Sequence, residues 1–213
     1  MSKILVRVGG VAAVVAALLI IAQQLWTELV TDPGQQEYLT DSIMYSSQLL
    51  LMVFGVIGIA LAQQRRAGVF AQIAALVAVL GCVLWFGASL VEVTLLPSLM
   101  AAGSPLVDNP PTGLVIVGLA SFVTYLVGLL LLSVSIIVTK VLPWQAAAVL
   151  GGGIVLALPL SSVVPGMLAV YAIGFGWLGV ACVRAAIMAD AKEGDSAHRV
   201  GTPTAASIDP SGE

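Results

Sequence analysis

The chain has few residues whose types and spacing could carry chemistry, and the first is the glycine pattern GFGWLG at residues 174–179. This G-x-G-x-x-G spacing holds a pyrophosphate when it follows a strand, opens a helix and precedes an acidic residue about 20 positions later. Here leucine, valine and aromatic residues flank the pattern on both sides, within a long apolar run. A pyrophosphate cannot enter hydrocarbon, so the pattern does not predict a nucleotide site.

Helical spacing accounts for these glycines better. Four small residues recur at intervals of three and four positions and share one helix face: Ala169, Ala172, Gly176 and Gly179. Small residues on one face let a neighbouring backbone approach closely in a membrane. We therefore predict a helix-packing face here, and a similar row at Gly10, Ala13 and Ala17.

Carboxylates within apolar runs are the next candidates. Glu92 stands in GASLVEVTLL, and a helix rising ~1.5 Å per residue from Arg66 brings it about 39 Å along, near the outer interface. It is predicted to be either a hydrated interfacial carboxylate or a group that binds a proton or cation together with Glu28, at similar depth.

Hydroxyls on the run 113–139 allow two interpretations. Ser121 and Thr124 share one helix face with Gly128 and Ser135. They predict a weakly polar helix contact or, alternatively, one wall of a substrate path.

Nothing in the sequence resembles a catalytic constellation or a metal-ligand cluster. The single histidine, His198, lies in a polar tail, and Cys82 and Cys182 stand apart within apolar runs. We expect no catalytic residue, no metal and no cofactor, and no nucleotide or nucleic acid as a partner. The sequence leans against an enzyme without excluding one.

The composition indicates the elements that position these residues. Hydrophobic residues make up 60% of the chain and charged residues 9%, against about 25% charged in soluble domains. Crossing ~30 Å of hydrocarbon takes roughly 20 helical residues. We predict an all-α, polytopic transmembrane helical bundle over residues 1–188. Its six spans are expected at about 5–29, 43–62, 67–92, 113–139, 143–162 and 166–187.

Charge sets the expected orientation. All eight lysines and arginines fall at the two ends of the chain or in the second and fourth connections. Basic residues favour the cytoplasmic side, which predicts both termini inside a bacterial inner (plasma) membrane. The loops 31–41 and 97–113 then face outward. Residues 159–166 form either a simple outer turn or a re-entrant loop, and 189–213 a disordered cytoplasmic tail.

The turn VLPWQAAAVLGGG, residues 141–153, opens a late span with a Leu-Pro-aromatic step. With the span layout, it resembles uncharacterised six-span integral membrane proteins of high-GC bacteria. The resemblance implies a multi-pass bundle and transfers no catalytic or binding residue.

Three functions fit these observations. The first is a non-catalytic accessory or scaffold subunit in the lipid bilayer, packing through small-residue helix faces against a membrane protein partner or a second copy. The second is a small-solute or ion transporter or channel with an outer acidic vestibule. The third is an intramembrane enzyme that uses Glu92 and Glu28.

Overall fold

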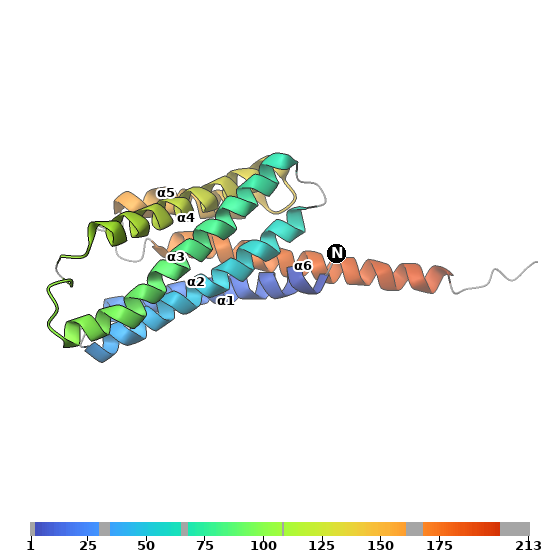
Figure 1. The fold of residues 1–213 in the computed structure, drawn as a ribbon. Coiled ribbons are helices and arrows are strands. Elements are labelled where there is room, and N and C mark those ends of the chain that lie inside the picture. The colour runs from blue at the N-terminus through green and yellow to red at the C-terminus, as the bar shows by residue number, and fades with distance from the viewer. Residues whose placement is uncertain (1–2, 30–34, 65–67, 108, 161–167, 201–213) are drawn as a thin grey trace, which may run out of the picture.

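The computed structural model describes residues 3–29, 35–64, 68–107, 109–160 and 168–200. Within these ranges every regular element is an α-helix, which confirms the all-α prediction. The helices, labelled in Figure 1, are α1 Lys3–Leu29, α2 Gln35–Gln63, α3 Val69–Ala101, α4 Thr112–Thr139, α5 Trp144–Leu160 and α6 Leu168–Val200.

Length and apolarity make most of these helices suitable for crossing a membrane. Five qualify by both measures: α1, α2, α3, α4 and α6. The remaining helix, α5, has 17 residues, at the lower end of the roughly 17–25 that a crossing needs. The chain therefore has the architecture of a multi-helix membrane protein, and six crossings remain a prediction that depends on α5.

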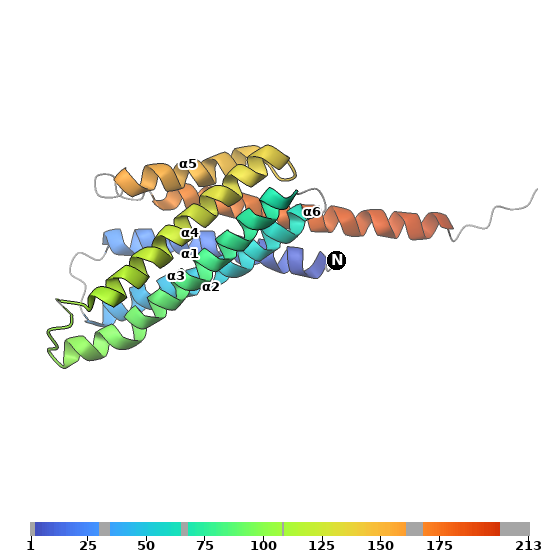
Figure 2. The ribbon, with the colours of Figure 1, turned by 45° about the horizontal axis from the view of Figure 1, so that its top comes forward.

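The helices form a ring that follows the order of the chain. Each of α1 to α5 packs against the next helix, and α6 closes the ring by packing along α1. Short connections explain this order, because they make consecutive helices antiparallel neighbours. Figure 2 shows one divergence, in which α4 separates from α5 toward the N-terminal end of α4.

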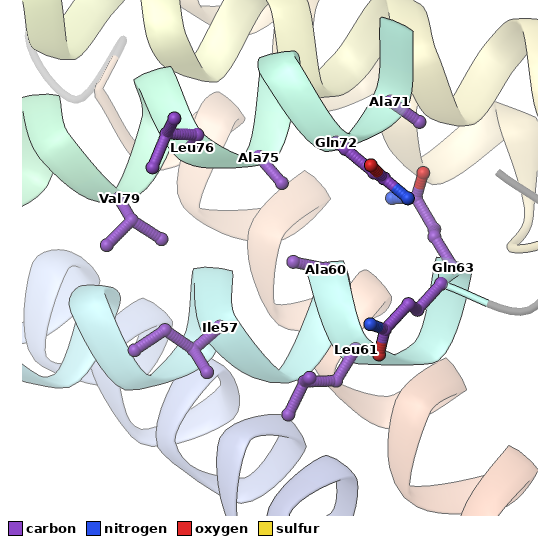
Figure 3. A pocket seen from close by; sticks show the side chains of 10 residues that line it. Ile57, Ala60, Leu61, Gln63, Ala71, Gln72, Ala75, Leu76 and Val79 are labelled. Atoms are coloured by element: carbon purple, nitrogen blue, oxygen red, sulfur yellow. The ribbon is translucent and has the colours of Figure 1, made fainter. Parts of the chain in front are cut away.

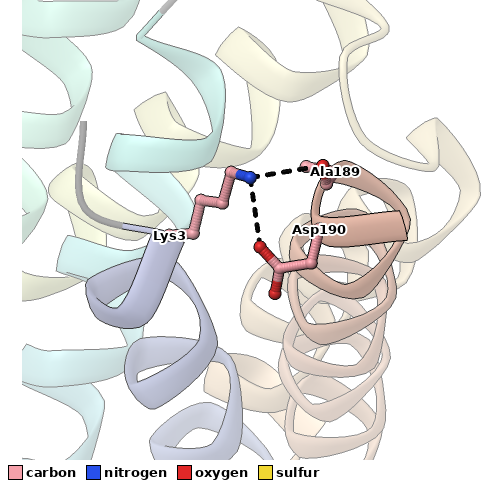
Figure 4. Close-up of polar contacts among 3 residues, drawn as sticks. All are labelled: Lys3, Ala189 and Asp190. Carbon is pink, nitrogen blue, oxygen red and sulfur yellow. Dashed lines mark hydrogen bonds and ion pairs between the residues drawn. The ribbon is translucent and has the colours of Figure 1, made fainter. Parts of the chain in front are cut away.

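A polar contact joins the ring-closing helices α1 and α6. Lys3 Nζ lies 3.1 Å from Asp190 Oδ1 and donates a 3.2 Å hydrogen bond to the Ala189 carbonyl (Figure 4). Asp190 is 56% exposed, so the ion pair adds little stability. The contact shows that the start of α1 lies beside the C-terminal half of α6.

Two helices end at residues with left-handed backbone. Gly103 has φ of 59°, and the amides of Gly103 and Ser104 donate to the carbonyls of Met100 and Leu99, the Schellman pattern that ends α3. Lys140 has φ of 51° and caps α4 directly after Thr139. Single residues therefore set both helix ends.

The helix α3 is longer than the predicted span 67–92. It continues through Pro97 to Ala101, so the loop predicted at 97–113 begins later. Proline removes one backbone N–H from a helix, and here the loss falls within the last turns. The chain leaves the helix at Gly103 instead, where glycine accepts the left-handed conformation.

Two further boundaries differ from the predictions. The helix α2 begins at Gln35, so much of the expected loop 31–41 is helical. The helix α6 continues to Val200, so residues 189–200, expected at the start of a disordered tail, are helical. Alanine, lysine and glutamate in this stretch favour the helix. Residues 161–167 and 201–213 lie outside the described ranges, and with them most of the predicted outer turn and the rest of the predicted tail.

Glycines lie where the helix backbones approach most closely. A Cβ added to Gly9 of α1 would stand 2.5 Å from the Cα of Gly58 on α2. A Cβ added to Gly179 of α6 would stand 2.6 Å from the carbonyl oxygen of Gly10 on α1. Gly9 and Gly10, which are adjacent in the sequence, thus let α1 pack closely against both α2 and α6. Close backbone approach is how helices associate where lipid removes the hydrophobic effect.

The GFGWLG pattern serves two helix contacts at once. Gly174 faces α5, where an added Cβ would stand 2.7 Å from the Leu150 Cα. Gly176 faces α1, where an added Cβ would stand 3.0 Å from the Ala17 Cβ. Gly179 also faces α1, so the spacing places glycines of α6 against both neighbouring helices.

The two predicted rows of small residues therefore meet each other. Gly176 and Gly179 of α6 lie against Gly10, Ala13 and Ala17 of α1. Farther along the same face of α6, Ala172 is fully buried and Ala169 is partly buried. These rows form an internal seam of the chain rather than an open surface.

Candidate functional site

The two carboxylates considered from the sequence, Glu28 and Glu92, belong to α1 and α3. Their side chains lie outside the described part of the structure. The acidic vestibule predicted from them therefore stays a prediction.

The hydroxyls of Ser121 and Thr124 bond within their own helix. Ser121 Oγ donates to the Val117 carbonyl at 2.8 Å, and Thr124 Oγ1 donates to the Ala120 carbonyl at 2.7 Å. A bond to the carbonyl four residues earlier satisfies a hydroxyl without a partner helix. Both interpretations of these hydroxyls therefore stay predictions.

A polar network centred on α2 crosses the interior of the bundle. Five side chains of α2 each form a hydrogen bond with a side chain of another helix, and we call these residues the α2 network. The pairs, in order along α2, are Asp41–Gln23, Tyr45–Trp85, Ser46–Ser89, Met52–Tyr125 and Gln63–Ser135. Their partners lie on α1, α3 and α4, so the network connects α2 to three helices.

The N-terminal half of α2 carries three of these pairs. Gln23 Nε2 donates to Asp41 Oδ1 at 3.0 Å. The indole N–H of Trp85 donates to the Tyr45 hydroxyl. The Ser46 and Ser89 hydroxyls lie 3.2 Å apart. Because Ser89 already donates to a carbonyl of its own helix, Ser46 is the donor between them. In all three pairs the donor is an uncharged group, and one of the three acceptors is a carboxylate, that of Asp41.

Aromatic residues and sulfur occupy the middle of the network. Tyr125 Oη lies 3.6 Å from Met52 Sδ, a weak acceptor. The Trp85 and Phe122 rings pack with centroids 5.0 Å apart and planes tilted by 50°, a favoured geometry for aromatic pairs. These contacts join α2, α3 and α4.

Among the residues that the structure describes, two amide atoms on α2 are buried without a hydrogen-bond partner: Gln48 Oε1 and Gln63 Nε2. The two residues are only 3% and 2% exposed. Leaving a buried polar atom unpaired costs about 1–3 kcal/mol, so such atoms are uncommon and mark positions where a ligand could bond.

Sequence reasoning did not predict the α2 network. A signal was present, because Asp41, Tyr45, Gln48 and Met52 recur at intervals of four, three and four residues. That spacing places these side chains in a stripe along one face of a helix. The partners on α3 and α4 have no comparable pattern.

The chemistry of this site is hydrogen bonding. Among the described residues no three His, Cys, Asp or Glu side chains gather as metal ligands. The α2 network contains one carboxylate, that of Asp41, and both Cys82 and Cys182 are buried free thiols. The arrangement can fix helices or hold a polar ligand, and it lacks the paired acid and base groups of general acid–base catalysis.

No protein-family model, curated protein sequence or solved structure matches this chain. Its function has to be inferred from the helix packing, the α2 network and the exposed surfaces.

Proposed function

We propose that this chain is a non-catalytic accessory or scaffold subunit of a bacterial inner membrane, with both termini in the cytoplasm. Its long apolar helices support the membrane setting. The placement of all eight basic residues at the chain ends and in two connections supports the orientation. Hydrogen bonds that tie helix to helix support a structural role for its interior polar groups.

The N-terminal half of α4 is the observation that carries this proposal. Five large apolar side chains there are each at least 50% exposed: Leu114, Val115, Ile116, Val117 and Leu119. Consecutive helical residues point about 100° apart, so residues 114–117 expose this segment on all sides. An added Cβ on Gly118 would also meet nothing within 4 Å. We infer that a helix of a partner membrane protein packs here.

The seam between α1 and α6 cannot supply this contact, because its small residues already face one another. The proposal thus keeps the predicted function but moves the partner surface to α4. Figure 2 shows that this half of α4 diverges from α5.

Two matched glycine substitutions test the partner surface. Gly118 on α4 and Gly87 on α3 both have nothing within 4 Å of an added Cβ, so leucine at either position should leave the bundle intact. We expect a specific protein to copurify with the wild type and with Gly87→Leu in mild detergent, and to be lost with Gly118→Leu. Equal recovery with both variants would contradict the proposed surface.

A transporter for a small solute or ion is the second candidate, and one observation favours it. Gln48 Oε1 is buried and unpaired close to the polar pairs of Tyr45 and Ser46 on α2. A carbonyl oxygen without a donor could bind a cation or a polar solute that enters from the Asp41 end of α2.

Substitution of Gln48 separates the two candidates. In a scaffold, Gln48→Leu removes an unpaired polar atom, so stability should rise or stay level and function should persist. In a transporter the same variant should fold normally and lose activity. Glu92→Gln adds a second comparison, since a hydrated interfacial carboxylate predicts no phenotype and a transport group predicts a defect as severe as that of Glu92→Ala.

A further inference from the structure

A groove of about 290 Å³ lies between α2 and α3, at the ends where these helices are joined. Alanines at positions 60, 71 and 75 make it possible, because their small side chains leave space between the helices. Larger apolar side chains extend it away from the joined ends: Ile57, Leu61, Leu76 and Val79. The groove follows α2 for roughly 9 Å, at a rise of ~1.5 Å per residue.

Polar groups gather at one end of this groove. Figure 3 shows the side chains of Gln63 and Gln72 at the end opposite Ile57 and Val79. Gln63 is 2% exposed, and its Oε1 accepts a 3.1 Å hydrogen bond from Ser135. Its Nε2, however, has no acceptor within the described part of the chain. The occupant of the groove should therefore bring an acceptor to this end and an apolar body to the rest.

The start of α3 adds a preference for negative charge at the same end. This helix has 33 residues, no acidic residue in its first turn, and no side-chain hydrogen bond capping it at Gly68. Uncapped backbone N–H groups at a helix N-terminus carry partial positive charge and attract anions such as phosphate. Together with the Gln63 donor, they match a phosphodiester oxygen.

We propose that this groove binds one membrane phospholipid, with an acyl chain along the alanines and the phosphodiester at Gln63 and Gln72. A flexible chain can fill a narrow groove and recover contacts that an empty space would forfeit. A partner helix is about 10 Å wide and has its backbone groups bonded internally, so its backbone would offer no acceptor to the buried amide. By the predicted orientation the lipid belongs to the cytoplasmic leaflet. This site is separate from the partner surface on α4.

Native mass spectrometry of the full chain in mild detergent tests the site, with dioleoyl phosphatidylglycerol and dioleoylglycerol as the two probes. We expect one phosphatidylglycerol to stay bound, and dioleoylglycerol, which lacks the phosphate, to bind about tenfold more weakly. Equal binding of the two probes would overturn the assignment of the polar end.

Two variants and one control test the location. Ala75→Leu fills the groove and should lower phosphatidylglycerol occupancy about tenfold. Gln72→Leu, at an exposed side chain that folding should tolerate, should lower it several-fold. Ala185→Leu places the same leucine on an exposed alanine of α6 and should leave occupancy unchanged. Equal occupancy in all four proteins would overturn the proposal, as would a lipid-free dimer that Ala75→Leu abolishes.

Discussion

Gly10 of α1 and Gly179 of α6 lie directly opposite each other across the seam that closes the ring. An added Cβ on Gly10 would stand 2.8 Å from the Gly179 carbonyl oxygen, and one on Gly179 would stand 2.6 Å from the Gly10 carbonyl oxygen. Neither backbone can retreat without separating the two helices. The close packing of the first helix against the last therefore requires glycine at both positions.

Alanine at Gly179 is expected to destabilise the bundle by about 1–3 kcal/mol, the usual cost of overpacking. Gly152→Ala on α5 is the matched control, because its added Cβ meets nothing within 4 Å. Alanine favours helices over glycine, so the control should be neutral or slightly stabilising. Thermal unfolding in detergent measures both, and equal melting temperatures would contradict the close approach.

The glycines of GFGWLG should differ in their tolerance of alanine. At Gly174 an added Cβ meets backbone atoms, with the Ala146 carbonyl oxygen at 2.9 Å, whereas at Gly176 it meets the Ala17 side chain at 3.0 Å. We expect Gly174→Ala to lower the melting temperature clearly and Gly176→Ala to lower it little. Leucine at Gly176 should disrupt the seam, since nothing that large fits beside Ala17. The reverse ranking of the two alanine variants would show that α5 and α6 pack differently.

Ser135 and Ser133 provide a test of the α2 network at Gln63, the last residue of α2. Ser135→Ala leaves both amide atoms of Gln63 buried without partners, at a cost of about 1–3 kcal/mol. Ser133 Oγ bonds only to a carbonyl of its own helix among its described contacts, so Ser133→Ala should cost much less. Denaturant unfolding of both variants gives the difference, and matching losses would argue against the bond between α4 and α2.

The Tyr45–Trp85 pair should couple α2 to α3. Tyr45 takes part in a further interaction, so a double-mutant cycle of Tyr45→Phe and Trp85→Phe is needed to isolate the bond. We expect a coupling free energy of about 0.5–1.5 kcal/mol. Additive effects of the two changes would mean that the bond contributes nothing to stability.

Much of this fold follows from sequence patterns. Long apolar runs predict the helices, and the spacing of Gly176 and Gly179 predicts a packing face. A single sequence does not show which face meets which, so the match with Gly10 and Ala17 appears only in the structure. The ends of α3 at Ala101 and of α6 at Val200 differ from prediction because local preferences for breaking or continuing a helix are weak.

The candidate site is less predictable than the fold. The polar stripe of Asp41, Tyr45 and Gln48 could be found from its spacing. The parts that Trp85 and Ser89 play in the network depend on contacts that only the structure shows. The unpaired Gln63 nitrogen and the exposed half of α4 depend on burial, which pattern reasoning does not supply. Hydroxyls such as that of Thr124 suggest function in a sequence, yet a bond within their own helix satisfies them.

Photo-crosslinking in native membranes tests the central claim, that the N-terminal half of α4 binds a partner membrane protein. A photoreactive amino acid is introduced at Val117 of α4 or, as the control, at Ile173 of α6; these side chains are 61% and 54% exposed. We predict one protein adduct of defined mass at Val117, lost with Gly118→Leu, and lipid adducts alone at Ile173. Lipid adducts alone at both positions would contradict the claim.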